Sequence, residues 1–267
     1  MDFVDFIALF FVCLSAAVVF MSGMFVFGHR MRRYDIVDVA WGLVFIVVTI
    51  TGLLMSGGAH IVQYLVLGMV AVWGLRLGGH IYRRLRSSTS EDKRYVEMRK
   101  KWQAKNEAAA IFFRVYMVQA LLATMVCLPA IVLTNSDDVM LSPVVGSGFV
   151  IWLIGFSIEV LSDRQLRLFI ANPDNKGQLM TQGLWRYSRH PNYFGELTLW
   201  WGLGIMALSV PFGWIGLVGP TLISFLIIFI SGIPPTERAF SGRPGWAEYK
   251  RRTSVLIPWV PKKDNAS

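Results

Sequence analysis

Charged residues are scarce in this sequence. Only 16% of its 267 residues are Asp, Glu, Lys or Arg, whereas 54% are hydrophobic, and the mean hydropathy is +0.50. A soluble domain of this size carries about 25% charged residues. The scarcity argues against an ordinary soluble enzyme, and the long apolar runs indicate a polytopic membrane protein instead.

Residues that bind metals or form cross-links are rare as well. The two cysteines, Cys13 and Cys127, lie inside apolar segments, which argues against a structural disulfide or a thiolate metal site. No two of the four histidines are three or four residues apart. This spacing argues against the di-iron desaturases and hydroxylases, which need many imidazoles, and we predict no metal.

The familiar nucleotide-binding motifs are missing too. The chain contains neither G-x-G-x-x-G nor a Walker A lysine. Any nucleotide must therefore be held by a fold specific to membranes rather than by a Rossmann unit.

The apolar runs predict seven transmembrane helices, each long enough at a rise of about 1.5 Å per residue. We expect one all-α integral membrane domain over 1–267, with substrate-side helices in 1–134 and cofactor-binding helices and a cytoplasmic cap in 144–267. The predicted spans are Phe3–Phe27, Ile36–Met55, Ile61–Tyr82, Ile111–Thr134, Val144–Leu161, Phe194–Val210 and Phe212–Ile233.

Basic residues are absent from alternate loops. The segments 55–60, 134–140 and 209–213 contain no Lys or Arg, and neither does the N-terminal MDFVD. The positive-inside rule therefore places the N-terminus outside and the C-terminus in the cytoplasm. The net charge of +9 is explained by this membrane surface, so we expect no nucleic-acid partner. The N-terminus lacks the basic start of a cleavable signal peptide.

The densest polar region spans 159–196. Glu159, Asp163 and Arg167 are spaced at i, i+4 and i+8, so they share one helix face. A solvated helix end with snorkelling charges is the alternative.

The stretch GLWRYSRHPNYFGE (183–196) follows. Pro191 suits the first position of a helix, whose free amides and dipole beside Arg189 and His190 favour phosphate. Asn192 and Glu196 are one turn apart and are expected to face inward. A positive-inside signal with an aromatic belt is the plainer reading.

Two further regions carry polar residues next to spans. Asp38 opens the second helix and Arg76 lies near the end of the third; they form a buried ion pair or contact a ligand. SEDKRY (90–95) is a charged loop or completes that site. In the tail, the acids and bases of 237–249 indicate a folded cap, whereas Lys250–Arg252 alone would suit an anchor for anionic lipid.

The stretch GLWRYSRHPNYFGE, with NPDNKG before it and EYKRRTSVLIPW after it, resembles the steroid 5-alpha-reductase family. The segments YDIVDVAWG, WGLRLGGHIYRR and SEDKRY resemble its bacterial steroid-reductase-like branch. The resemblance implies a seven-helix membrane enzyme with NADPH in a cytoplasm-facing pocket. It also implies reduction of the carbon–carbon double bond of a lipophilic enone, typically a 3-oxo-4-ene steroid.

The resemblance also assigns candidate residues. The family's substrate-side pair is a Glu in the second helix and a Tyr in the third; this chain has Asp38 and Trp73 there, with Tyr82 two turns further on. A carboxylic acid donates to a ketone only when protonated, so Asp38 would need apolar surroundings. The candidate catalytic residues are Asp38, Tyr82 and Arg76. The candidate cofactor-binding residues are Arg94, Tyr95, Asp163, Arg167, Lys176, Trp185, Tyr187, Arg189, His190, Asn192, Tyr193, Glu196, Glu237, Arg238 and Tyr249.

Two other functions remain open. The same motif resembles isoprenylcysteine and phospholipid methyltransferases, which bind S-adenosylmethionine, although arginine-rich surroundings suit NADPH phosphates better. A non-enzymatic lipid-binding or scaffold protein would leave the Asn192–Glu196 pair without a task. We expect a monomer in a bacterial inner membrane, whose partners are membrane lipid and a lipophilic substrate that enters from the bilayer.

Overall fold

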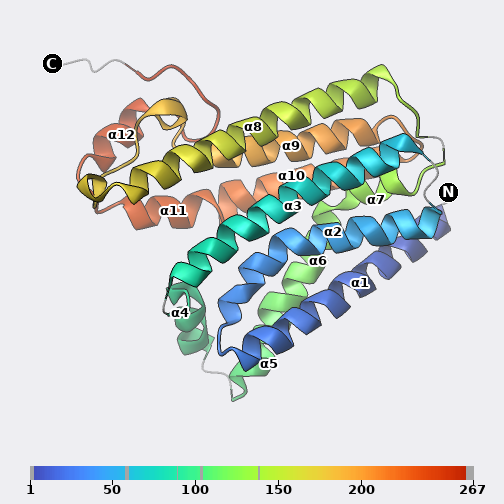
Figure 1. Cartoon of the computed structure of the whole chain (residues 1–267), viewed down its shortest axis with the longest axis horizontal. Coiled ribbons are helices and arrows are strands. Elements are labelled where there is room, and N and C mark those ends of the chain that lie inside the picture. The colour runs from blue at the N-terminus through green and yellow to red at the C-terminus, as the bar shows by residue number, and fades with distance from the viewer. Residues whose placement is uncertain (1–2, 58–59, 89, 103–104, 138, 263–267) are drawn as a thin grey trace. The chain divides into compact units, whose positions relative to one another are not determined.

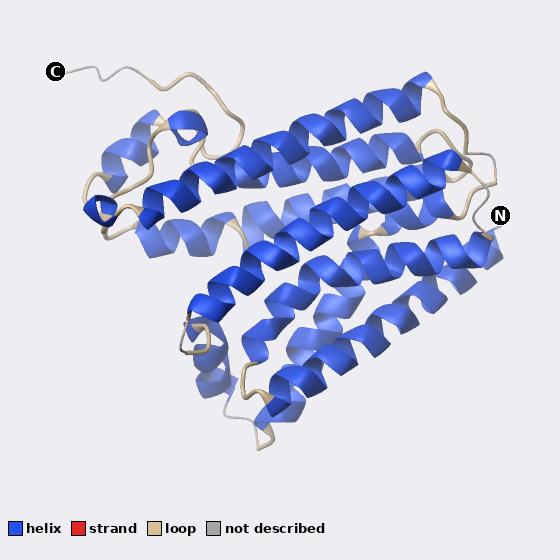
Figure 2. Ribbon diagram, in the orientation of Figure 1, coloured by secondary structure: helices blue, strands red, loops and turns tan. Residues whose placement is uncertain are grey.

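The computed structural model describes residues 3–57, 60–88, 90–102, 105–137 and 139–262. These residues form helices, turns and loops without a β-strand (Figure 2), which confirms the predicted helical class. The helices pack into two compact units. The first unit is Met1–Ser142 with Ala207–Gly219, and the second is Pro143–Met206 with Pro220–Ser267.

The first unit is built on three long helices that lie side by side (Figure 1). Its described elements are α1 (Phe3–Arg30), the 3-10 turn η1 (Tyr34–Ile36), α2 (Val37–Ser56), α3 (Ile61–Ser87), α4 (Lys93–Trp102), α5 (Glu107–Ile111), the π-helical turn η2 (Phe112–Met117), α6 (Val118–Val126), α7 (Leu128–Thr134) and the 3-10 turn η5 (Gly213–Leu217).

Glycine lets α2 and α3 approach closely. A Cβ atom added to Gly42 would lie 2.6 Å from the carbonyl oxygen of Gly74, which leaves no room for a side chain. Around this contact Phe45 packs edge-on against Trp73, and both side chains are buried. Trp73, the residue at the position of the family's Tyr, is therefore part of the core of this unit.

The second unit pairs two long helices and completes them with short ones near the C-terminus. Its described elements are α8 (Pro143–Ala171), the 3-10 turns η3 (Pro173–Asn175) and η4 (Gly183–Arg186), α9 (Pro191–Ala207), α10 (Val218–Phe225), the π-helical turn η6 (Leu226–Ile230), α11 (Ile233–Phe240) and α12 (Trp246–Arg252). α10 begins within the first unit and continues into the second.

Glycines also set the contact between α8 and α9. A Cβ on Gly148 would lie 2.6 Å from the carbonyl oxygen of Gly202, and one on Gly195 would lie 2.6 Å from that of Gly155. Each helix thus carries two glycines seven residues apart, about two helical turns. Backbones can pack directly against one another at these points, as small residues allow between helices in lipid.

Six described helical segments are long and apolar enough to cross a membrane, which supports a polytopic membrane protein. They are Val4–Arg30, Tyr34–Ser56, Ile61–Ser87, Glu107–Val126, Pro143–Ala171 and Gly213–Phe240. α9 covers most of the remaining predicted span and has 17 residues. The count of seven spans stays a prediction.

Several predicted boundaries differ from the structure. The run 111–134 is divided by a π-helical turn and by a break at Cys127, after which the next helix begins at Leu128 with Pro129 in its first turn. α8 continues to Ala171, ten residues beyond the predicted end of the span at Leu161, and it contains Glu159, Asp163 and Arg167, as their predicted common helix requires. The prediction that Pro191 starts a helix is confirmed.

Candidate functional site

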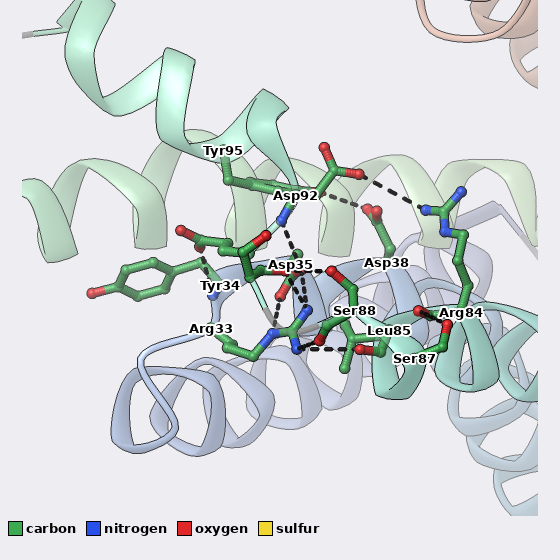
Figure 3. Close-up of polar contacts among 12 residues, drawn as sticks. Arg33, Tyr34, Asp35, Asp38, Arg84, Leu85, Ser87, Ser88, Asp92 and Tyr95 are labelled. Atoms are coloured by element: carbon green, nitrogen blue, oxygen red, sulfur yellow. Dashed lines mark hydrogen bonds and ion pairs between the residues drawn. The ribbon is translucent and has the colours of Figure 1, made fainter.

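Arg33 organises the polar end of the first unit. Its guanidinium donates to both carboxylate oxygens of Asp35, at 3.2 and 2.9 Å. It also donates to the carbonyl oxygens of Leu85, Ser88 and Ser90, at 3.2, 2.9 and 3.1 Å. One side chain therefore joins the turn before α2 to the segment that follows α3 (Figure 3).

Asp38 lies at the centre of a second group of contacts. The Tyr95 hydroxyl donates to its Oδ1 at 2.5 Å, and Arg94 donates to its Oδ2 at 2.7 Å. The guanidinium of Arg94 also donates two hydrogen bonds to Asp92, at 3.1 and 3.0 Å, and the backbone N–H of Arg94 donates a third, at 2.9 Å. Figure 3 shows Tyr95 and Asp38 directed toward each other from α4 and α2. The structure thus brings together three residues predicted from separate motifs or loops.

Glu91 fastens the start of α4 from the other side. It accepts the backbone N–H of Tyr34 at 2.9 Å and two hydrogen bonds from Arg99, at 2.9 and 2.6 Å. The backbone N–H of Asp92 in turn donates to Asp35 at 2.9 Å. The segment SEDKRY is therefore an ordered part of this unit rather than a solvated loop.

Beside these contacts lies a cavity of about 290 Å³. It is lined by Arg33, Asp35, Asp38, Ile81, Arg84, Leu85, Ser88 and Asp92. The side chain of Asp38 is 17% exposed, whereas Tyr95 is buried behind it. Asp38 is thus the member of the Asp38–Tyr95 pair that reaches the cavity.

The protonation of this group follows from its surroundings. Burial, reinforced by the charge of Asp38, raises the pKa of Tyr95 well above its usual range, so the phenol keeps its proton. Burial alone would lower the pKa of Arg94, but its hydrogen bonds to Asp92 and the charge of Asp38 raise it above the ordinary value. Tyr95 is therefore a neutral donor and Arg94 a fixed cation.

The other two candidate catalytic residues lie on α3. Tyr82 is 48% exposed, and Arg76 is half-buried. Neither is among the residues that line the 290 Å³ cavity. In the structure the tyrosine paired with Asp38 is Tyr95, which the sequence had placed among the cofactor-binding residues.

The second unit contains a larger cavity, of about 560 Å³. It is formed by the end of α8, the segment after it, the start of α9, and α11 and α12. Its lining residues are Leu166, Phe169, Ile170, Ala171, Asn172, Pro173, Asn175, Lys176, Gly177, Gln178, Leu179, Met180, Trp185, Arg189, His190, Asn192, Tyr193, Thr236, Phe240, Arg243, Trp246 and Tyr249. This wall contains three Lys or Arg side chains, six aromatic rings and no carboxylate.

Two buried polar atoms in this wall have no hydrogen-bond partner. They are Nε2 of His190 and Oδ1 of Asn192. His190 stacks on Tyr193 with ring centroids 5.3 Å apart, and its Nε2 lies 3.6 Å from Glu237, beyond hydrogen-bond distance. Burial lowers the pKa of His190 to about 4, so the ring is neutral at physiological pH. Leaving a buried polar atom without a hydrogen bond is costly in free energy. Such atoms are therefore expected in a site where a bound ligand supplies the missing hydrogen bonds.

Arg189 holds the second unit together beneath the cavity. Its guanidinium pairs with Glu237 at 2.6 Å and donates to the carbonyl oxygens of Lys250 and Thr253, at 2.9 and 2.7 Å. Tyr249 adds a hydrogen bond from its hydroxyl to the carbonyl oxygen of Trp185, at 2.6 Å. Arg189 is therefore largely occupied by protein groups, and Lys176 and Arg243 are the freer cations of the wall.

The predicted cofactor-binding residues divide into two groups. Seven of them line the 560 Å³ cavity: Lys176, Trp185, Arg189, His190, Asn192, Tyr193 and Tyr249. The others of this unit lie outside its lining: Asp163 and Glu196 are half-buried on α8 and α9, Arg167, Tyr187 and Arg238 are exposed, and Glu237 contacts Arg189.

Some lining residues were not predicted. Asn172 and Asn175 lie in the NPDNKG segment without being candidate residues, and the sequence also assigns no cofactor role to Phe169, Phe240, Arg243 and Trp246. The pairing of Trp246 with Arg189, whose guanidinium carbon lies 5.8 Å from the ring centroid, joins positions 57 apart in sequence. The aromatic residues within 240–249 were the sequence feature that could have identified this part of the cavity wall.

Comparison with known proteins identifies a family. The model of the family described as "Protein of unknown function (DUF1295)" matches residues 24–253. Human 3-oxo-5-alpha-steroid 4-dehydrogenase 1 is 29% identical over 125 residues, which are 47% of this chain and 45% of the human protein. The mouse protein of the same name is 32% identical over 75 residues, 28% of this chain and 29% of its own length. The predicted family resemblance is confirmed.

A methyltransferase is also similar over a shorter stretch. The probable O-methyltransferase ustE of Ustilaginoidea virens is 35% identical over 63 residues, 24% of this chain and 22% of that protein. The chain thus matches less than half the length of these curated relatives. No solved structure matches.

Proposed function

We propose that this chain, which belongs to the DUF1295 family, is a membrane oxidoreductase that uses NADPH to reduce the carbon–carbon double bond of a lipophilic enone. The similarity to 3-oxo-5-alpha-steroid 4-dehydrogenase 1 supports this reaction class. The observation that carries the proposal is the 560 Å³ cavity, whose wall has cations, aromatic rings and unpaired polar atoms but no carboxylate.

The wall of this cavity fits a dinucleotide with phosphates. Lys176 and Arg243 supply positive charge, and carboxylates that would repel phosphate are absent from the lining. Trp185, Tyr193 and Trp246 offer faces for aromatic rings. His190 and Asn192 carry buried polar atoms that a ligand can satisfy. When bound, NADPH supplies the hydride for the reaction.

The Asp38–Tyr95 pair is the proposed acid on the substrate side. Reduction of an enone builds negative charge on the ketone oxygen, and a hydrogen bond to that oxygen stabilises the enolate. Asp38 reaches the 290 Å³ cavity, and we propose that it is the group through which this pair acts on the ketone. Tyr95 and Arg94 hold the carboxyl in place, so they are positioning residues.

The cofactor is tested first by binding. Titration of the detergent-solubilised protein with NADPH should raise its unfolding temperature, and S-adenosylmethionine should have no effect. Arg243→Ala should weaken NADPH binding roughly tenfold, as expected for loss of one charge-assisted contact of about 1.4 kcal/mol. Arg164→Ala, an exposed change on α8 outside the cavity wall, serves as the control.

Turnover is tested with a 3-oxo-4-ene steroid and other lipophilic enones. Asp38→Asn should retain NADPH binding and lose turnover by about 100-fold or more, the usual effect of removing a general acid. Tyr95→Phe should lower turnover less, and Glu97→Gln on the exposed face of α4 should change nothing. Normal turnover in Asp38→Asn would remove this residue from the mechanism.

A methyltransferase is the second candidate because of the similarity to ustE. It predicts stabilisation by S-adenosylmethionine and none by NADPH. That single result would replace the reductase proposal.

We also propose an orientation in the membrane. The alternation of loops with and without basic residues supports a cytoplasmic C-terminus and cap, with the N-terminus outside.

A further inference from the structure

The segment that follows α12 exposes apolar side chains. Residues Ser254–Lys262, which we call the C-terminal loop, present Val255, Ile257, Trp259 and Val260 to the surroundings. Ile257 is 62% exposed and Trp259 is 73% exposed. A run of exposed apolar side chains of this size marks an interaction surface rather than ordinary exposure.

The loop is held firmly at the start of a span. The N–H of Arg189 donates to the carbonyl oxygen of Ser254 at 2.8 Å, and the N–H of Trp259 donates to that of Tyr187 at 2.9 Å. The Ser188 hydroxyl also donates to the carbonyl oxygen of Leu256, at 2.7 Å. Residues 187–189 are separated only by His190 from Pro191, the first residue of α9. The exposed side chains are therefore fixed at the level where α9 would enter the bilayer.

Basic residues gather at the base of the same loop. The N–H of Lys262 donates to the carbonyl oxygen of Arg252 at 3.0 Å, which closes the loop onto the end of α12. The last turn of α12 carries Lys250, Arg251 and Arg252. Arg252 pairs with Glu248 at 3.0 Å and Lys250 with Glu237 at 3.6 Å, and the four cations of this region, Lys250, Arg251, Arg252 and Lys262, outnumber these two carboxylates. Apolar side chains next to a cluster of positive charges are the arrangement that interfacial anchors use.

We propose that the C-terminal loop is an interfacial anchor for a bilayer surface rich in anionic lipid. Val255, Ile257, Trp259 and Val260 enter the headgroup region, where Trp is favoured, and Lys250, Arg251 and Lys262 contact acidic headgroups. Tyr187, 40% exposed beside the loop, belongs to the same surface. This anchor does not depend on the reductase proposal, because it needs only the loop and the membrane.

The test uses the full chain in nanodiscs, either of phosphatidylcholine alone or mixed with phosphatidylglycerol. Ile257→Cys and, separately, Trp259→Cys carry a bimane fluorophore, and Ala247→Cys on the exposed part of α12 is the control. The native cysteines, Cys13 and Cys127, are fully buried and should not react. Lipids with a nitroxide near the headgroup quench a fluorophore in the interface, and iodide quenches one in water.

The anchor predicts several-fold stronger lipid quenching at 257 and 259 than at 247, increased further by phosphatidylglycerol. Lys250→Gln with Lys262→Gln should remove that increase and leave the unfolding temperature of the protein nearly unchanged. Quenching by iodide alone, protection from both quenchers as in a contact with another protein, or the same lipid quenching with and without phosphatidylglycerol would each overturn the proposal.

Discussion

Burial decides the protonation of His190 in the second unit. Its ring is stacked on Tyr193, and Nε2 has no hydrogen-bond partner. A neutral histidine in that place can satisfy a ligand, whereas a protonated one would bury a charge beside Arg189 that Glu237, 3.6 Å away, offsets only in part. Its aromatic neighbours were evident from the motif RHPNY, but the missing partner could be seen only in three dimensions.

The first prediction is that acid destabilises this protein partly through His190. Its pKa is about 6.5 when unfolded and about 4 when folded, so the unfolded chain binds the extra proton between these values. This contribution to stability is complete above about pH 6.5 and is lost as the pH falls toward about 4. Unfolding temperatures in detergent across this range should fall less steeply for His190→Gln. Parallel curves for the two proteins would refute the prediction.

At the scale of elements, the glycines of α8 and α9 and the clamp made by Arg33 decide how the helices pack. The apolar runs predicted where helices lie, because hydropathy depends on each segment alone. They did not predict the π-helical turns or the extension of α8, since those depend on packing partners. The contact between Asp38 and Tyr95 fits the alternative that SEDKRY completes the site of Asp38, but the apolar runs could not select that alternative, because the two residues are 57 apart in sequence.

Gly148 and Gly146 offer a matched pair on α8. A Cβ at Gly148 would meet the carbonyl oxygen of Gly202 at 2.6 Å, whereas one at Gly146 has nothing within 4 Å. Gly148→Ala should destabilise the protein by about 1–3 kcal/mol through overpacking. Gly146→Ala should be neutral or slightly stabilising, because alanine favours helix. Thermal unfolding in detergent checks both, and equal effects would contradict the close packing of α8 on α9.

Arg33→Lys tests the hydrogen bonds by which Arg33 joins the turn before α2 to the end of α3 and the segment after it. Lysine keeps the charge but cannot hydrogen-bond to Asp35 and three carbonyl oxygens together. The free energy of unfolding should therefore fall by about 1–3 kcal/mol. Hydrogen exchange should quicken at the amide of Asp92, which donates to Asp35. Arg30→Lys, an exposed change at the end of α1, should leave exchange there unaltered. Unchanged protection in Arg33→Lys would mean that other contacts hold the loop.

At the scale of the whole molecule, charge and hydropathy gave the membrane class and a proposed orientation. The structure adds a division into two units, each with a cavity whose full lining no periodicity in the chain indicated. Their walls join residues far apart in sequence, such as Leu166 with Tyr249. Contacts of that range depend on tertiary packing, so single-sequence patterns cannot specify them.

The orientation is tested by labelling in intact cells. Met140→Cys, in an exposed loop free of basic residues, should react with a membrane-impermeant maleimide added outside. Ser241→Cys, exposed just after α11, should react only after the membrane is opened. The reverse pattern would invert the proposed topology and place the cavity of the second unit outside the cytoplasm.

The distance in sequence across the larger cavity has a consequence for biosynthesis. Its wall begins at Leu166 and is closed by Tyr249, and Arg189 meets its carbonyl partner at Thr253. A ribosome must therefore synthesise more than 80 residues after the first wall residue before the site can close. At a synthesis rate of about 5–20 residues per second, α9 waits seconds for its partners, with Arg189 unpaired at the membrane surface.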